Sequence, residues 1–284
     1  MKTAIVFEGG ASRTSFTNGV IDELLRQGIK ADYVIGTSAG IGNGMSFVTR
    51  QFGRNLKISL KYQSDKRYMG KRYLLKRGNR SYYNIDFVFD KVPNEYCPFD
   101  KEAIERFGKD IYACATNMRT GRAEYLPVRD EGGVWRSLVA SCALPLLFKP
   151  VEINGELYMD GGVADPVPFE KAIRDGCDRV IVVLTREREY RKSHHEFLMD
   201  TSAAYYRKYP KFSKKLIMRG FIYNAQRERL FEREREGKVF IIAPENIGAF
   251  KRTESDGAAL LELYRQGRRC TKARMKELRE YLSE

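Results

Sequence analysis

The segment Gly36-Thr37-Ser38-Ala39-Gly40 matches G-x-S-x-G, a pattern that holds a serine at a sharp bend between a strand and a helix. An apolar run at 33–35 precedes the motif, and an apolar helical pattern follows it. Larger side chains two residues from such a serine would collide, which explains Gly36 and Gly40. The motif predicts that Ser38 is a nucleophile of acyl transfer. The alternative is a glycine-rich turn whose serine has no chemical role.

A serine hydroxyl needs a base, and histidine is the usual one. The chain has two histidines, His194 and His195, in a polar stretch at 191–196 that is typical of a solvated surface segment. A carboxylate is therefore the predicted base, and Asp160 is the best candidate because it ends an apolar strand and precedes two glycines. Burial there would raise its pKa and make it a stronger base. The alternative is an aspartate that only begins a turn.

A second glycine-rich segment, Glu8-Gly9-Gly10-Ala11-Ser12-Arg13, follows the first apolar run of the chain. Acyl transfer produces an oxyanion, which the main-chain amides of Gly9 and Gly10 could stabilise because no side chain blocks them. A glycine loop in this position could instead bind a dinucleotide phosphate. The chain, however, contains neither G-x-G-x-x-G nor G-x-x-x-x-G-K-[ST].

The elements that would position these residues alternate between strands and helices. Asn154-Gly155 predicts the turn of a hairpin at 151–159. Apolar runs predict strands, and helical spacing predicts helices at 16–27, after Ser38 and near the C-terminus. The predicted strands lie at 3–7, 33–35, 111–115, 179–184 and 238–242. Two successive strand-to-helix units predict an α/β fold with a mainly parallel sheet and right-handed crossovers.

The composition of the 284 residues predicts a packed protein, with 43% hydrophobic and 31% charged residues. Five widely spaced cysteines without a C-x-x-C pair predict neither a disulfide framework nor a zinc site, and they favour a reducing compartment. The chain shows no signal-peptide pattern and no apolar run of the length that spans a membrane. We therefore expect a cytoplasmic protein without a metal or cofactor, whose contact with membranes, if any, is peripheral.

The formal net charge of +14 is concentrated in two places. Between Arg50 and Arg80 there are eleven Lys and Arg residues and a single acid, Asp65, and the tail after 186 is also basic. Residues 50–80 interleave these cations with Tyr62 and other aromatic and aliphatic residues, which suits an anionic membrane surface. Nucleic acid is the less favoured partner because no nucleic-acid-binding signature is present. A solvated helical face is the alternative.

The three chemical segments, in this order, resemble those of the bacterial patatin-like phospholipases. Further segments match the same family. They are Ala140-Ser141-Cys142-Ala143-Leu144-Pro145, Ala115-Thr116-Asn117 and Asp165-Pro166-Val167-Pro168. The resemblance covers at least residues 3–186, and more weakly 238–267.

This resemblance implies a patatin-like three-layer sandwich and a Ser-Asp dyad that hydrolyses phospholipid or lysophospholipid esters. Ser38 would form an acyl-enzyme, Asp160 would be its base, and the Gly9-Gly10 loop would form the oxyanion hole, braced by Arg13. The other functional reading is a non-catalytic membrane- or nucleic-acid-binding protein that retains the fold.

Two residues depart from the family pattern. Ala11 stands where a third glycine is common, and Thr14 stands where a glycine follows the basic residue. Alanine disfavours a positive φ, so the loop geometry and the catalytic rate could differ from those of the family. We expect one patatin-like domain over 1–284, with a core at 1–186, a basic insertion at about 50–95, and a helical tail at 187–284 whose strand near 238–243 returns to the sheet.

Overall fold

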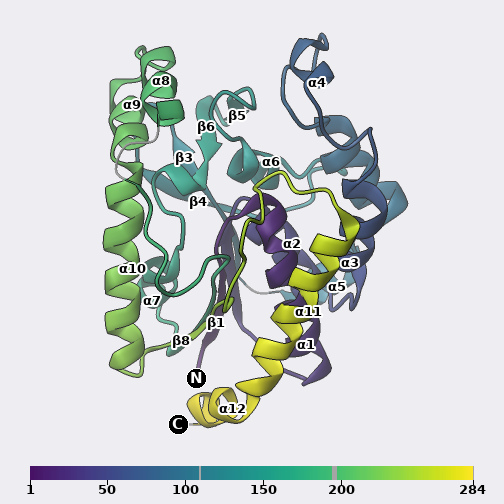
Figure 1. Cartoon of the computed structure of the whole chain (residues 1–284), viewed down its shortest axis with the longest axis vertical. Helices are drawn as coiled ribbons and strands as arrows, with labels where there is room; N and C mark the ends of the chain where they lie inside the picture. The colour runs from purple at the N-terminus through teal and green to yellow at the C-terminus, as the bar shows by residue number, and fades with distance from the viewer. Residues whose placement is uncertain (109, 194–196, 284) are drawn as a thin grey trace.

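The computed structural model describes residues 1–108, 110–193 and 197–283, which form a sheet between two layers of helices (Figure 1). The strands lie in the order β5-β6-β3-β2-β1-β7-β8, and β4 pairs with β3. Their bounds are β1 Thr3–Phe7, β2 Tyr33–Thr37, β3 Asp110–Asn117, β4 Ala123–Pro127, β5 Val151–Ile153, β6 Glu156–Asp160, β7 Arg179–Val183 and β8 Val239–Ile242. The described part of the chain is therefore a three-layer α/β sandwich.

The helices were predicted in part from their apolar spacing. Those that cover the sheet or flank it are α1 Ser15–Arg26, α2 Ala39–Val48, α5 Lys101–Phe107, α6 Arg136–Cys142, α7 Phe169–Arg174, α8 Phe197–Tyr205, α9 Pro210–Ile217, α10 Arg219–Arg235, α11 Gly257–Ala273 and α12 Met275–Ser283. No helix among the described ranges has both the length and the apolar character to cross a bilayer.

The sheet is parallel through its centre, where β1, β2, β3, β7 and β8 run together. Successive residues of β1 enter different cores, Ile5 and Phe7 one and Ala4 and Val6 the other. Helices α1, α2 and α11 cover the first core, and α7 and α10 cover the second (Figure 1). Because both faces are buried, the strand appears in the sequence as a continuous apolar run rather than an alternating one.

The predicted hairpin is present as β5 and β6. Its two turn residues, Asn154 and Gly155, have φ of 50° and 77°, the positive values that a tight hairpin turn needs. Strand β6 also pairs antiparallel with β3, so that Asp160 lies opposite Ala115. Strand β4, which the sequence analysis missed, is a half-exposed edge strand with a proline at its end, and such strands carry a weak apolar signal.

The basic insertion folds against the core through short helical pieces. These are α3 Arg54–Ile58, α4 Arg72–Leu75 and two π-helical segments, Ser59–Gln63 and Phe87–Tyr96. Tyr62 packs with Phe87 and Val92, and Arg54 is buried, donating two hydrogen bonds to the Cys97 carbonyl at 2.7 and 3.1 Å. Part of the insertion is therefore interior, and the prediction that its tyrosines lie on a surface is wrong for Tyr62.

Helix α11, near the C-terminus, lies directly against α1. A Cβ atom at Gly19 would lie 2.0 Å from the Tyr264 carbonyl oxygen, and one at Gly267 would lie 2.1 Å from the Phe16 carbonyl oxygen. Only glycine allows this approach at either position. The two helices, distant in sequence, therefore share main-chain contact.

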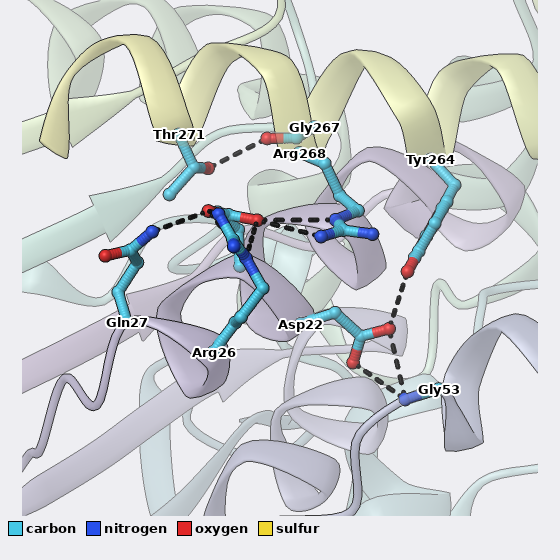
Figure 2. Close-up of polar contacts among 9 residues, drawn as sticks. Asp22, Arg26, Gln27, Gly53, Tyr264, Gly267, Arg268 and Thr271 are labelled. Carbon is cyan, nitrogen blue, oxygen red and sulfur yellow. Dashed lines mark hydrogen bonds and ion pairs between the residues drawn. The ribbon is translucent and has the colours of Figure 1, made fainter.

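Polar contacts reinforce the same interface (Figure 2). The Asp22 carboxylate accepts hydrogen bonds from the Tyr264 hydroxyl at 2.8 Å and from the Gly53 amide at 3.0 Å. Glu23 pairs with Arg268 at 3.1 Å. Asp22 thus connects α1, the start of the basic insertion and the tail.

Candidate active site

Ser38 lies between β2 and α2, with φ of 56° and ψ of −137°. Non-glycine residues rarely adopt such a conformation, which costs on the order of 1–3 kcal/mol and occurs mainly at functional sites. A Cβ at Gly36 would lie 2.9 Å from the Phe7 carbonyl oxygen, and one at Gly40 would lie 2.5 Å from that of Glu8. The two glycines thus allow the main chain at the end of β1 to pack closely against the turn that contains Ser38.

The main chain of Ser38 is held from β3 and α6. Its amide donates to Ser141 Oγ at 2.8 Å, and the Ser141 hydroxyl donates to the Cys114 carbonyl at 2.6 Å. Ser141 is buried, so this chain of bonds is shielded from water. The contact orients the bend without using the Ser38 hydroxyl.

Asp160 is buried at the end of β6, with 2% of its surface exposed. Its Oδ1 accepts the Gly162 amide at 2.7 Å, while Oδ2 is buried and accepts no hydrogen bond of good geometry from the described residues. Burial raises the pKa of Asp160, and the Ser38 hydroxyl is the first of several groups that oppose this rise. The structure therefore brings the predicted nucleophile and base to one site, where both line the smaller cavity.

The glycine loop passes beside Ser38. A Cβ at Gly9 would lie 3.1 Å from Ser38 Cβ, so a larger residue would crowd the serine. Among the described residues, no hydrogen bond is donated by the Gly9 or Gly10 amide. Glu8 anchors the loop, because its carboxylate accepts the Thr185 amide at 2.6 Å and the Tyr223 hydroxyl at 2.7 Å. The two glycine amides remain available to an anion.

The two departures from the family pattern are both accommodated. Ala11 has φ of 48°, the conformation that we expected alanine to disfavour. The Thr14 hydroxyl donates to the Ala11 carbonyl at 2.6 Å and accepts from Asn43 Nδ2 at 2.8 Å. Thr14 thereby ties the strained alanine to α2, a contact that a glycine could not make.

Arg13 contacts the loop mainly through its main chain, because its amide donates to the Gly10 carbonyl at 3.1 Å. Its side chain is buried, and Nε has no hydrogen-bond partner. Burial lowers the pKa of Arg13 to about 10, and the like charges of Arg186 and Arg252 lower it further. Arg13 lines the smaller cavity together with Glu8, whose charge opposes this lowering of its pKa.

Two cavities meet at Ser38. The larger, of about 140 Å³, is lined mainly by apolar side chains, several of them from the basic insertion. These include Ile58, Tyr68, Val88, Phe89, Val92, Trp135, Leu138 and Phe148. The smaller, of about 70 Å³, contains Asp160, the glycine loop and several cations. Ala11, Ser38 and Leu144 line both.

Sequence reasoning missed the site residues that come from distant segments. Arg186 follows β7, Tyr223 and Arg219 belong to α10, and Arg252 lies between β8 and α11. Their only sequence signal was a charged tail without a motif. Ser141 was noted within a family segment but received no role. His194 and His195 lie outside the described residues.

Comparison with known proteins identifies relatives of this chain by sequence and by fold. The model of the patatin-like phospholipase family matches residues 5–173, and that of a domain of unknown function, DUF6363, matches residues 209–283. The VipD protein of Legionella pneumophila has a similar fold, with a TM-score of 0.51 over 97% of this chain and 67% of its own, at 13% identity.

Curated relatives are similar over about two thirds of the chain. The YjjU protein of Escherichia coli is 29% identical over 191 residues, covering 65% of this chain and 52% of its own length. The lysophospholipase NTE1 of Saccharomyces cerevisiae is 28% identical over 185 residues, which is 63% of this chain and 10% of the yeast protein. The chain thus spans about half of one relative and a tenth of the other.

Proposed function

Because this chain belongs to the patatin-like phospholipase family, we propose that it is a serine lipid acyl hydrolase that cleaves phospholipid or lysophospholipid esters. Lysophospholipases of similar sequence support this substrate class. The observation that carries the proposal is a strained serine beside a buried carboxyl group, at the mouth of an apolar cavity. That cavity would hold the acyl chain.

In the proposed reaction, Ser38 Oγ attacks the ester carbonyl carbon as its proton passes to Asp160 Oδ2. The amides of Gly9 and Gly10 stabilise the oxyanion. The alcohol leaves with the proton from Asp160. Water, deprotonated by Asp160, then attacks the acyl-enzyme, and the proton returns to Ser38 as the fatty acid leaves.

A fluorophosphonate probe tests the nucleophile, because it reacts covalently with an activated serine. We expect the wild-type protein to be labelled and Ser38→Ala to be unlabelled. Asp160→Asn keeps the shape of the side chain but removes the base, so ester hydrolysis should fall roughly 10²–10⁴-fold. Ser64, an exposed serine away from both cavities, supplies the matched control, and Ser64→Ala should be labelled as strongly as wild type.

Equal labelling of Ser38→Ala and wild type would exclude Ser38 as the nucleophile. Absence of labelling in folded wild-type protein would favour the alternative, a binding protein that retains the fold.

We also propose that the basic insertion contacts an anionic membrane surface. Leu75, at the end of α4, is 90% exposed, and Lys71, Arg72, Lys76 and Arg77 flank it in the sequence and are exposed. An exposed leucine among cations suits the boundary between lipid headgroups and acyl chains. Contact there would bring lipid close to the segment that lines the apolar cavity.

Co-sedimentation with vesicles tests this contact. Each cation near an anionic membrane contributes about 1 kcal/mol, so Lys76→Gln with Arg77→Gln should weaken binding to anionic vesicles by at least roughly tenfold. Arg235→Gln, an exposed cation at the far end of α10, should not. Equal binding of the wild-type protein to neutral and anionic vesicles would contradict the electrostatic contact.

A further inference from the structure

The smaller cavity beside Ser38 is strongly cationic. Of the described residues that line it, five carry a positive charge and two, Glu8 and Asp160, are acids. The cations are Arg13, Arg186, Lys192, Arg219 and Arg252. Both Glu8 oxygens already accept hydrogen bonds, from Thr185 and Tyr223. Glu8 acts favourably on Arg13, and Asp160 on Arg219 and Arg252, but two acids leave a cavity with five cations an excess of positive charge.

Three of these arginines lie near one another without a direct ion pair to any described carboxylate. Among the described residues, no ion pair joins a carboxylate to Arg13, Arg186 or Arg252. Arg13 is buried, with an unpartnered Nε, and the charges of Arg186 and Arg252 oppose its own. Arg186 and Arg252 are half-buried, and like charges beside a buried arginine are costly unless an anion joins them. A bound anion would turn this repulsion into attraction.

The position of the cavity identifies the kind of anion. Ser38, Ala11 and Leu144 line both the apolar and the cationic cavity, so the two cavities adjoin at the serine. An ester bound at Ser38 with its acyl chain in the apolar cavity would direct its alcohol portion into the cationic one. In a glycerophospholipid, that portion carries a phosphate, for which arginine is the favoured partner.

We propose that this cationic cavity binds the headgroup phosphate of the substrate, so that the enzyme prefers lipids with an anionic headgroup over those with a choline headgroup. The proposal rests on the proposed hydrolase function of Ser38. A quaternary amine next to the phosphate would be repelled by the same cations that attract the phosphate. Arg186 and Arg252 lie outside the residues 5–173 that match the family, so this preference would belong to the part of the chain that follows the matched segment.

Arg186 is the best residue for a test. It acts on Arg13, and it is not among the groups that act most on Asp160, whereas Arg219 and Arg252 both lower the pKa of Asp160. Replacing Arg186 therefore changes the cavity with the least effect on the base. Arg186→Lys is a control that keeps the charge. Arg235→Gln is a control that removes the same charge from an exposed site at the end of α10. That site lies about 24 Å from Arg219 at the start of the helix, at 1.5 Å per residue.

The experiment compares kcat/KM for lysophosphatidic acid and lysophosphatidylcholine of one acyl chain length, both as monomers. We expect wild-type protein to favour lysophosphatidic acid by about tenfold or more, because the cations of the cavity attract the phosphate of both lipids but repel the choline amine of lysophosphatidylcholine. Arg186→Gln should reduce this ratio at least severalfold, Arg186→Lys should retain most of it, and Arg235→Gln should leave it unchanged. Added salt should also reduce the ratio. A wild-type ratio near one, or a ratio that Arg186→Gln leaves unchanged, would overturn the proposal.

A binding measurement separates this proposal from the proposed reaction. Ser38→Ala protein is titrated calorimetrically with glycerol 3-phosphate and with inorganic phosphate, and Ser38→Ala/Arg186→Gln should bind both more weakly. If phosphate binding depends on Arg186 but the wild-type protein hydrolyses no ester, the proposed hydrolase function is wrong, and so is the proposal that a lipid phosphate occupies the cavity. Hydrolysis without headgroup preference would refute only the headgroup site, and Arg186-dependent binding in that case would identify a site for free phosphate.

Discussion

At the scale of single residues, the raised pKa of Asp160 makes its carboxylate a stronger base and lowers the stability of the fold. Burial raises its pKa above the ordinary 3.8, which makes the carboxylate a stronger base. The same shift means that the unfolded chain releases this proton at a lower pH than the folded protein does. The carboxyl group therefore destabilises the fold progressively as the pH rises from 3.8 through the folded-state pKa, and fully above it.

Replacing Asp160 should therefore stabilise the protein at neutral pH. Asparagine keeps an oxygen for the Gly162 amide but carries no charge, so Asp160→Asn should raise the free energy of unfolding at pH 7 and raise it less at pH 4. Urea unfolding at the two pH values measures both changes. A gain that is the same at pH 4 and pH 7 would show that the charge is not the cause.

Ala11 has a main-chain conformation that alanine disfavours. Its φ of 48° costs an alanine about 1–2 kcal/mol, whereas glycine tolerates it but loses more conformational freedom on folding, roughly 0.4–1 kcal/mol. We expect Ala11→Gly to increase the free energy of unfolding by up to about 1 kcal/mol, measured by chemical denaturation.

Gly28 provides the reverse control for Ala11. Its φ is 72° and no atom lies within 4 Å of a Cβ built there, so Gly28→Ala reports the conformational cost alone. This variant should lose stability by about the amount that Ala11→Gly gains. If Ala11→Gly were clearly destabilising, the alanine would be making contacts that outweigh its strained main chain.

At the scale of elements, the contact between α1 and α11 depends on two glycines. A Cβ at Gly267 would overlap the Phe16 carbonyl oxygen, so Gly267→Ala must force the helices apart and should cost about 1–3 kcal/mol or prevent folding. Gly257, also in α11, is the matched control, because its nearest neighbour would lie 3.8 Å away.

The expected difference between these two variants is large. Gly257→Ala should be neutral or stabilising by up to about 1 kcal/mol, since alanine favours a helix. Thermal and chemical unfolding of both variants measure the contrast. Similar stability of Gly267→Ala and Gly257→Ala would mean that α1 and α11 do not approach as closely as described.

At the scale of the whole molecule, the segments matched by the two family models are joined in one structure. Strand β8 lies within 209–283 and extends the sheet beside β7, and α11 covers the core that also contains Trp135. We therefore propose that core and tail form one folding unit, in keeping with the single domain that we predicted for 1–284.

A single folding unit should unfold in one step. Trp135 is the only tryptophan and is buried in the core that α11 covers, so its fluorescence reports that core, while far-ultraviolet circular dichroism reports all helices. We expect the two signals to change at the same denaturant concentration. Two separated transitions, with the tail helices lost first, would instead indicate two domains.

The chemical segments could be recognised in the sequence because each is local. The bend at Ser38 and the hairpin turn at Asn154-Gly155 depend on a few neighbouring residues, and apolar runs reveal buried strands. The edge strand β4 escaped because it is half exposed, and Tyr62 was misjudged because its cationic neighbours are solvated while its own ring is buried.

The sequence by itself thus determined every strand except β4, part of the helices, and the bends that present Ser38, Asp160 and the glycine loop. The tertiary structure alone decided which of these bends meet, and that arginines from the tail join them, because strand order and helix docking bring together residues far apart in the chain. Local patterns record how each segment is buried, but they carry no information about the segment that buries it.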